Sequence, residues 1–372
     1  MLDSQLGVRL LLLIGDTVPL PAPYPVTTAL VRAQVTNDAR TGDGFQLTFA
    51  LGRDSVTDYG LIASGVLAPW KRVVLSVVFG ALPEVLIDGV ITHQQVTPSD
   101  QPGASTLTVQ GRDISKLLDL EEKNDEFPNQ ADFMIVTRVL AGYAQYGLVP
   151  EVTPTTDFPI MVQRVPRQHE TDFALIQRLA QANGYVFYVQ PLTIGVNTAY
   201  WGPEIHAGVP QPALTIGLGA SDNLRGIHFS LDASAPVAET GTFVEPFSKS
   251  VIPIPALPSL RLPPLVANPT QARRTTLARD TSNENAGRAA VSLLAAAMSA
   301  PDAVTAQGEL DGIRYGHVLR ARGLVGVRGA GWAYDGLYYV RSVTHTITIG
   351  TYGQSFTLSR EGTGSLTPAV IP

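Results

Sequence analysis

Cysteine is absent from the 372-residue sequence, and charged residues are few. Without cysteine the chain can form no disulfide, no thiolate metal site and no cysteine nucleophile. Lys, Arg, Asp and Glu make up 16% of the residues and give a net charge of −6, and Lys and Arg never form a run longer than two. Nucleic acid and anionic lipid both bind positive patches, so neither is expected as a partner.

The sequence also lacks an apolar run long enough to cross a bilayer. The N-terminal run Val8–Ile14 is far shorter than the ~20 apolar residues that a membrane-spanning helix needs. Asp3 and Asp16 stand where a signal peptide would have its basic region and its cleavage site. We therefore predict a strand at Val8–Ile14 and a chain made in the cytoplasm, with no secretion signal and no membrane insertion.

Metal-binding and catalytic patterns are missing as well. No histidine lies in an H-x-x-x-H or H-x-x-E-H frame, so no metal site is predicted. Three of the histidines, His93, His228 and His345, lie in or beside strand patterns, where a structural role is expected. The remaining histidines are His169, His206 and His317.

Three other segments resemble parts of catalytic or cofactor motifs without completing them. Glu121-Glu122 with Asp125-Glu126 is expected in a hydrated loop, where nothing holds two carboxylates in a cleft as glycoside cleavage requires. Ile62–Gly65 lacks the first glycine of a nucleophile elbow, and Gly217–Asp222 lacks the third glycine of a dinucleotide loop. We predict no catalytic, cofactor-binding or metal-binding residue, and the chain is not expected to be an enzyme.

Glycine and proline are plentiful, at 34 and 28 residues, which favours short strands joined by turns. Residues 1–120 are predicted to form a first β-barrel domain, with a polar Asn37–Gly44 hairpin tip and a turn at Asp88-Gly89. Asp113 and Trp201-Gly202-Pro203 are expected at turns or corners. The strands predicted here are Val26–Thr36, Phe45–Leu51, Arg72–Phe79, Glu84–His93 and Thr106–Gln110.

Residues 121–191 change to helical spacing and are predicted to form a connecting α+β domain. Apolar residues three and four apart indicate a helix in Ala131–Gly147. A second helix begins at the cap Thr171 and ends at Asn183-Gly184, and the strand Tyr185–Val189 follows at once. This unit of helix, glycine and aromatic strand is the most distinctive part of the sequence.

Residues 192–372 are predicted to form a second β-barrel domain. It includes a Pro-rich extended arm at 251–269, with six prolines, and a helix near 284–299. Gly323–Gly331 is expected to be a hairpin turn. The later strands are predicted at His317–Leu324, Leu337–Ile349 and Gln354–Arg360. The fold class is therefore mainly β with a few helices, α+β.

The order of these units resembles a known family. Thr171–Tyr188, TDFALIQRLAQANGYVFY, resembles the S-D-(W/F)-x-F-(I/L)-x-R-L-A-x-x-x-G-(Y/F) segment of phage late-control gene D proteins and of the VgrG hub region, with a departure at Ala174–Ile176. Leu86–Ile91 resembles the F-x-G-x-I strand pair of that family. Thr108–Asp113 matches its T-V-x-G-x-D step, and Asp335–His345 its G-x-Y-x-V-x-x-V-x-H segment. The resemblance runs from about residue 30 to 361, and only the Pro-rich arm has no counterpart.

The resemblance implies a trimeric ring in which each chain has two tail-tube-like β-barrel domains and helix-containing insertions. Three such chains would present six similar surfaces and adapt a six-fold tail tube to a three-fold spike. The implied partners are two further copies, a tail-tube or tube-initiator protein, baseplate wedge proteins and a spike. The spike is expected to be a separate polypeptide because the sequence ends at Pro372. Assembly is expected in the bacterial cytoplasm, within a phage virion baseplate or an injection-system particle, and no cofactor is implied.

Two alternative functions stay open. A tail-associated peptidoglycan hydrolase would need paired acids in a cleft. A peripheral carbohydrate- or receptor-binding β protein would need a cluster of exposed aromatic residues, whereas Trp70, Trp201 and Trp332 are far apart in sequence.

Overall fold

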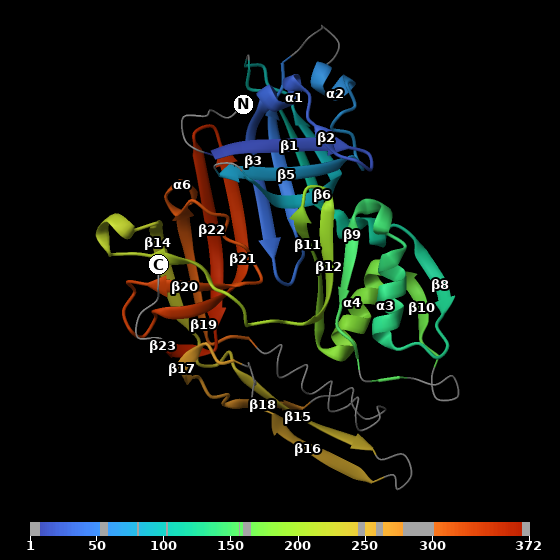
Figure 1. Ribbon diagram of the computed structural model, residues 1–372, viewed down its shortest axis with the longest axis vertical. Helices are drawn as coiled ribbons and strands as arrows, with labels where there is room; N and C mark the ends of the chain where they lie inside the picture. The colour runs from blue at the N-terminus through green and yellow to red at the C-terminus, as the bar shows by residue number, and fades with distance from the viewer. Residues whose placement is uncertain are drawn as a thin grey trace.

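The computed structural model describes residues 8–52, 59–79, 82–101, 103–155, 157–158, 165–244, 250–257, 263–277 and 301–366. Over these residues the protein is mainly β with a few helices, which confirms the expected α+β class. One large sheet runs through the middle of the molecule, and a layer that contains helices lies beside it (Figure 1).

One half of the large sheet comes from the first third of the chain and is called here the N-terminal unit. Its elements are β1 (Val8–Gly15), β2 (Leu20–Pro21), α1 (Tyr24–Ala29), β3 (Leu30–Asp38), β4 (Gly44–Ala50), α2 (Gly60–Ala63), β5 (Arg72–Phe79), β6 (Leu82–Thr97) and β7 (Thr106–Asp113). Six strands follow the order β3-β4-β7-β6-β5-β1, and every neighbouring pair is antiparallel.

Alternation of side chains along these strands builds the core of the N-terminal unit. In β4 the residues Phe45, Leu47 and Phe49 are buried, while those between them are half-buried. Such period-two burial is the pattern of a strand with one face on a core. The β5 run is instead buried at six consecutive residues, because both of its faces are covered.

The other half of the large sheet, called the C-terminal unit, comes from the last part of the chain. Its elements are β13 (Gln211–Thr215), β14 (Leu224–Leu231), β19 (Val304–Asp311), α6 (Gly312–Tyr315), β20 (Leu324–Arg328), β21 (Gly336–Thr348) and β22 (Thr351–Arg360). The strands follow the order β14-β19-β22-β21-β20-β13. They enclose a second core, which includes Leu310, Tyr338 and Phe356.

The two units repeat one strand order. Taken along the chain, β13, β14, β19, β20, β21 and β22 hold the places of β1, β3, β4, β5, β6 and β7. A short helix also lies between the third and fourth strands of each unit, α2 in one and α6 in the other. The order of pairing is therefore the same in both halves of the sheet.

The register is repeated too. β3 shifts register against β4 between Leu30 and Arg32, and β14 shifts against β19 between Leu224 and Gly226. β6 against β7, and β21 against β22, also shift register at corresponding places. There the shift lies between Ile91 and His93 in β6, and between Val340 and Ser342 in β21.

Even an unusual backbone conformation occurs in both units. Trp70 and Arg322 have φ values of 69° and 65°, and only three described residues other than glycine have positive φ. Trp70 donates its N–H to Ile91 O over 2.8 Å, and Arg322 donates its N–H to Val340 O over 2.8 Å. Each of these residues enters the fourth strand of its unit in the same way.

The units also differ. β1 is antiparallel to β5, whereas β13 is parallel to β20. A short tip joins β3 to β4, but the chain between β14 and β19 contains β15 (Val237–Val244), β16 (Val251–Leu257), β17 (Val266–Pro269) and β18 (Arg274–Leu277). Among the described strands the two ends of each unit do not pair, so the expected closed barrels are not seen.

The predicted Pro-rich arm is thus partly paired. β16 lies antiparallel to β15, which also pairs in parallel with β18. β17 pairs with β23 (Gly362–Ser365) near the end of the described chain. The helix predicted near 284–299 lies outside the described residues.

A smaller α/β layer lies beside the N-terminal unit (Figure 1). Its elements are β8 (Glu122–Glu126), α3 (Asp132–Ala141), β9 (Leu148–Val152), β10 (Arg167–Thr171), α4 (Asp172–Asn183), β11 (Tyr185–Thr193) and β12 (Val196–Pro203). β11, β12 and β9 form one sheet, and both helices share its core with Trp201. The layer therefore includes β12, which lies beyond residue 191.

The α4 helix has the ends that the sequence predicts. Thr171 Oγ1 accepts a hydrogen bond from Ala174 N over 3.2 Å, which satisfies one of the free N–H groups of the first turn. Gly184 ends the helix in the left-handed conformation, with φ of 66°. The first predicted helix is shorter than expected, since α3 ends at Ala141 and a 3₁₀ turn, Ala144–Tyr146, leads to Gly147.

Several local predictions are wrong. The first residues of the expected strand Val26–Thr36 form α1, where Pro25 sits in the first helical turn. Asp88-Gly89 is not a turn but part of the continuous strand β6, and Trp201-Gly202-Pro203 lies in β12. Glu122–Glu126 is the strand β8 instead of a loop.

The segment before β20 is another correction. His317–Gly323 forms no strand, because side-chain amides take the place of a ladder: Gln354 accepts from Leu319 N over 2.8 Å and donates to His317 O over 2.9 Å. The expected hairpin turn at Gly323–Gly331 instead contains β20.

Candidate functional site

The acidic residues considered from sequence do not converge. β8 pairs with β10, and the side chains of Glu126 and Arg167 form an ion pair over 3.0 Å with about 60% of each exposed. Exposed pairs of this kind contribute about 0–1 kcal/mol. Glu121 and Asp125 are exposed as well. The residues form a solvated ribbon rather than a pair of carboxylates in a cleft.

The strand histidines lie where they were predicted. His93 and His228 are exposed on β6 and β14, whereas His345 is buried on β21. His345 Nδ1 lies 2.9 Å from the Tyr352 hydroxyl. Burial, with a smaller contribution from the charge of Arg320, lowers the pKa of His345 to about 3, so the ring is neutral at pH 7. Within the described part of the chain, no group of three or more His, Cys, Asp or Glu side chains could hold a metal ion.

The structural feature with the clearest functional meaning is the contact between the two units, called here the seam. Residues Ser342–Thr348 of β21 pair antiparallel with Arg32–Asp38 of β3, so the large sheet continues from one unit into the other (Figure 1). The Thr36 and Thr344 hydroxyls, from directly opposite residues, lie 3.1 Å apart. Ala39 N also donates to Arg341 O over 2.9 Å.

Apolar side chains of the C-terminal unit complete the core of the N-terminal unit at the seam. Val318, Ile347 and Tyr352 are at most 5% exposed and belong to the cluster that contains Leu47. The Tyr352 ring lies 5.8 Å from that of Phe79, centroid to centroid. Burying a large apolar side chain contributes roughly 1.5–3 kcal/mol, so these contacts hold the units together more firmly than strand pairing alone.

A buried ion pair also crosses the seam. Arg322 donates from Nη2 to Asp43 Oδ1 over 2.6 Å and from Nη1 to Asp43 Oδ2 over 3.2 Å. The two side chains are 5% and 1% exposed. Burial lowers the pKa of Arg322, but the charge and hydrogen bonds of Asp43 outweigh it and the pKa is raised. The guanidinium also lies 4.4 Å above the Tyr188 ring of β11, which ties the α/β layer to the same point.

Asp113 supports the same cluster from β7. Its carboxylate accepts hydrogen bonds from Asp43 N over 3.1 Å and from Ser115 N over 2.9 Å. Burial, together with the nearby Asp43 charge, raises the pKa of Asp113. Both carboxylate oxygens of Asp113 accept backbone N–H groups, so the residue stabilises the corner that the sequence predicts.

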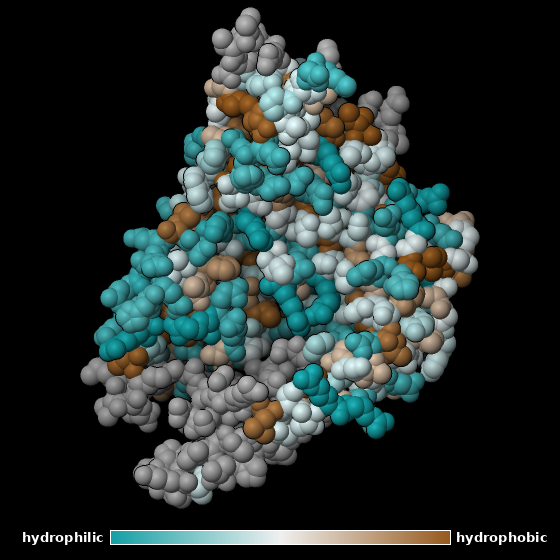
Figure 2. Space-filling view, turned by 180° about the vertical axis from the view of Figure 1, so that it is seen from behind, coloured by the Kyte–Doolittle hydropathy of each residue, from teal (hydrophilic) through white to brown (hydrophobic). Residues whose placement is uncertain are grey.

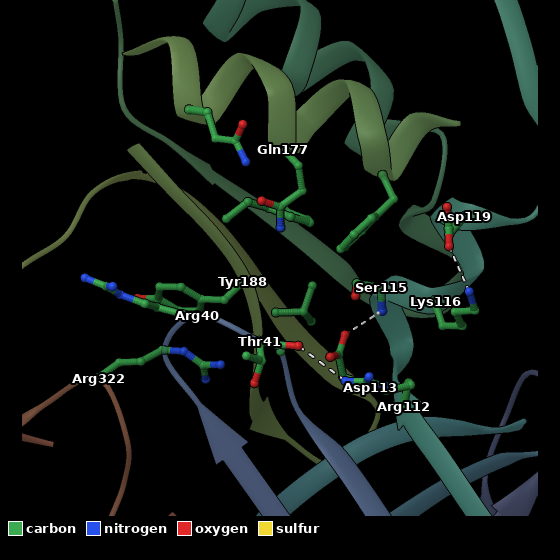
Figure 3. Close-up of a pocket in the computed structure, with 15 residues that line it drawn as sticks. Arg40, Thr41, Arg112, Asp113, Ser115, Lys116, Asp119, Gln177, Tyr188 and Arg322 are labelled. Carbon is green, nitrogen blue, oxygen red and sulfur yellow. Dashed lines mark hydrogen bonds and ion pairs between the residues drawn. The ribbon is translucent and has the colours of Figure 1, made fainter. Parts of the chain in front are cut away.

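A cleft of about 490 Å³ opens beside this cluster, between the N-terminal unit and the α/β layer (Figure 3). Arg40, Arg112, Lys116 and Arg322 give its wall a positive character. Asp119, its second carboxylate, accepts from Lys116 over 2.8 Å and from Thr171 over 2.8 Å. Both carboxylates of the cleft are thus engaged, and the cleft has no acid–base pair of the kind that a hydrolase needs.

A second buried ion pair fixes the α/β layer to the N-terminal unit. Arg72 donates to Asp88 over 2.8 and 2.6 Å, and both side chains are at most 3% exposed. Asn197 donates to the same Asp88 carboxylate over 2.9 Å, and Arg72 also reaches Tyr146 O and Gly195 O. The layer is therefore attached through charged groups as well as through packing.

Sequence analysis missed the charged groups of both clusters. Arg72 stands at the head of a β-branched run and Asp88 inside one, and a charge in such a run is the available signal of a buried partner. Arg322 and Asp43 are 279 residues apart and carry no such signal.

The outer surface mixes polar and apolar side chains. Seen from behind, apolar side chains gather mainly at the top of the molecule (Figure 2). Large exposed apolar residues in the β1–α1 region include Val18, Leu20 and Tyr24, at 64–74% exposed. None of the described helices has the length and apolar character to cross a membrane.

Solved structures with a similar fold include two tail proteins and a component of the type VI secretion system. A tail protein from Neisseria meningitidis MC58 superposes with a TM-score of 0.63 at 14% identity, over 95% of this chain and 97% of that one. The 43 kDa tail protein of prophage MuSo2 from Shewanella oneidensis gives 0.59 at 15% identity, over 95% and 98%. The Escherichia coli c3393 protein, a component of the type VI secretion system, gives 0.55 at 15% identity, over 92% and 77%. At these identities the likeness shows a shared fold.

No curated protein sequence matches the chain. A family model described as the Alg8 N-terminal domain matches residues 21–236, which is more than half of the sequence. The match covers β3 to β7, the α/β layer and the first two strands of the C-terminal unit. The chain therefore belongs to the Alg8 N-terminal domain family.

Proposed function

We propose that this protein is a non-enzymatic structural hub in the baseplate of a phage tail or contractile injection machine, and that three copies form a ring. The observation that carries the proposal is the repeat of strand order and register in the two units. Three chains with two like units each present six similar surfaces around a three-fold axis. Such a ring joins a six-fold tail tube to a three-fold spike.

The fold shared with solved tail proteins supports this role, and so does the resemblance of Thr171–Tyr188 to late-control gene D and VgrG hub segments. The proposed partners are two further copies, a tube or tube-initiator protein, a spike protein and baseplate wedge proteins. In this role the two units are the tail-tube-like domains, and the α/β layer connects them. The hub templates the tube, holds the spike and leaves with both when the sheath contracts.

The other two functions have less support. A hydrolase would need acids that converge, and those of β8 are exposed, with Glu126 paired to Arg167. A receptor-binding surface would need clustered aromatic residues, and Trp201 is fully buried in the core of the α/β layer.

Light scattering on the purified chain tests the proposal, alone and co-expressed with candidate tube and spike proteins. A particle with three times the 39.6 kDa of one chain, alone or with a stoichiometric partner, is the expected result. A single-chain mass that neither partner changes would contradict it.

A further inference from the structure

The seam joins two strand edges whose counterparts in the repeat, on β6 and on β14, pair with no strand among the described residues. On the side of β6 that faces β5, strand pairing ends near Ile91, so among the described strands Thr92–Thr97 pairs with β7 alone. β14, the counterpart of β3, pairs only with β19 among the described residues and ends the sheet (Figure 1). The edges of β3 and β21 therefore pair with each other inside the chain, whereas the corresponding edges of β14 and β6 pair with no described strand.

The repeated register says which residues would meet if the open edges paired as the seam does. Thr344 lies opposite Thr36 in the seam. The register shifts align the strands of the two units. Gln95 of β6 corresponds to Thr344 of β21, because each lies four residues after the last residue before the shift. Ser230 of β14 corresponds in the same way to Thr36 of β3, six residues after the last residue before the shift. Gln95 would thus lie opposite Ser230, and by the same count His93 opposite Asp232.

Burial at corresponding positions supports this pairing. His345 of the seam is 1% exposed, whereas its counterpart Val96 on the open edge is 40% exposed. Leu231, at the end of the other open edge, is 48% exposed. These apolar side chains project at the two places where an added strand would cover them.

Trp70 provides a second observation. Its counterpart Arg322 crosses the seam, where it binds Asp43 and donates to Asp38 O. Trp70 has the same left-handed backbone conformation, but its side chain is 50% exposed and lies outside the seam. A large aromatic residue held in a strained conformation at an open edge is suited to a partner surface.

We infer that β14 of one copy pairs antiparallel with Thr92–Thr97 of β6 in the next copy, in the register of the seam, with Trp70 packed against the neighbour near Asp232. Each copy uses a different edge at each contact, so the contact is head-to-tail, and three such contacts would close the proposed ring. This inference rests on the proposed ring and names the strands that close it. The partner is a second copy of this chain because the only observed complement of a β3-like edge is a β6-like edge of the same fold.

Engineered disulfides test the register, since the sequence has no cysteine of its own. The full-length double variant Gln95→Cys with Ser230→Cys is oxidised and separated without reductant. We expect covalent species of two and three chains. The corresponding residues of the seam, Thr36 and Thr344, have their hydroxyls 3.1 Å apart, so cysteines at 95 and 230 would be close enough to bond. The matched positive control is Thr36→Cys with Thr344→Cys, which should close a disulfide inside one chain.

The matched negative control is Gln95→Cys with Leu231→Cys. A slip of one residue turns the side chain to the other face of the strand, so at least tenfold less covalent species is expected. Chains with Ser230→Cys alone should stay uncrosslinked, and when mixed with chains with Gln95→Cys alone they should give only the two-chain species. Hydrogen exchange on the unmodified chain gives a second readout, with slower exchange at 92–97 and 226–231 on assembly.

The outcomes separate the pairing from the hub proposal. A three-chain mass without the Gln95–Ser230 disulfide, and without slower exchange at either edge, overturns the pairing and leaves the hub proposal standing. Disulfides formed by Ser230→Cys alone would show two β14 edges paired with each other, which also overturns it. A single-chain mass in the presence of tube and spike proteins overturns both.

Discussion

The two units follow one path through the sheet but differ in what surrounds corresponding positions. Arg322 is buried in a bidentate ion pair, whereas Trp70 at the same place in the other unit is half exposed. His345 is buried and neutral at the seam, whereas Val96 faces solvent. At these two positions the seam carries polar groups with fixed partners, and the open ends carry the uncharged side chains of Trp70 and Val96.

This difference teaches that the repeat is one of backbone rather than of side chains. At the start of the fourth strand, Arg72 pairs with Asp88 to fix the α/β layer. Its counterpart Leu324 packs in an apolar cluster with Tyr339. Each unit keeps the strand order and specialises its surface for the neighbour that it meets.

The largest expected effect comes from breaking the seam at Arg322. The substitution Arg322→Leu leaves Asp43 buried without its partner, and loss of one member of a buried pair costs about 3–5 kcal/mol. We expect the free energy of unfolding in urea to fall by that amount at fixed protein concentration. Arg314→Leu, at an exposed residue of α6, is the matched control and should change it by less than about 0.5 kcal/mol.

Trp70→Ala is the companion change in the other unit. Because the side chain is half exposed, we expect a small effect on unfolding and a clear weakening of assembly, seen by light scattering. Equal losses of stability for Trp70→Ala and Arg322→Leu would show that the two positions do not differ as described.

Placing a charge on an open edge should break assembly without unfolding the chain. Val96→Asp puts a carboxylate where the neighbouring strand would cover it, and an uncompensated charge in an interface costs several kcal/mol. The expected result is at least a tenfold rise in the dissociation constant of the ring. Val209→Asp, at a valine that is 93% exposed and belongs to neither β6 nor β14, should leave the ring intact.

The buried histidine of the seam, His345, should make the stability of the protein depend on pH. The pKa of His345 is about 3 in the folded protein and near 6.5 when unfolded, so the unfolded chain binds the extra proton between these values. This term therefore lowers stability as pH falls from about 6.5 towards 3, by at most about 1.4 kcal/mol per pH unit, and it vanishes above that range. His345→Asn should flatten the acid side of the profile, measured by urea unfolding.

The smallest expected effect is at the hydroxyl pair of the seam. Thr344→Val removes the contact with Thr36 and should cost about 1 kcal/mol, the usual worth of one neutral hydrogen bond. Ser230→Ala is the corresponding change on the open edge and should not alter the stability of the isolated chain. A thermal unfolding series compares the two, and equal shifts would contradict the assignment.

Elements whose ends are encoded locally could be predicted from sequence. Thr171 and Asn183-Gly184 mark α4 because a side-chain cap and a left-handed glycine act within one turn. The strand β5 was found with its bounds because four of its eight residues are valine, which favours strands.

Predictions failed where a distant contact sets the local structure. Gly89 was taken for a turn residue, yet a Cβ there would lie 2.1 Å from Arg112 O, so the glycine serves the close approach of β6 and β7. Gly202 was taken for a corner, and a Cβ there would meet Thr153 Oγ1 at 2.4 Å. Neither contact can be seen in a window of neighbouring residues.

The repeat of the two units was implied by the family resemblance, but the sequence itself does not display it. Corresponding positions hold Trp70 and Arg322, or Val96 and His345, and long insertions separate the strands differently. Register shifts and left-handed residues preserve the repeat, and these are properties of the backbone. The seam could be located only once the strands were paired.

Electron-microscopy class averages of the assembled protein test most directly the claim that like units form the ring. The averages should show a closed three-fold ring with six lobes of similar size at even spacing, alternately joined by the seam and by the β14–β6 contact. A ring with three lobes, an open chain or a two-fold particle would contradict the claim that the two units of each copy are equivalent building blocks.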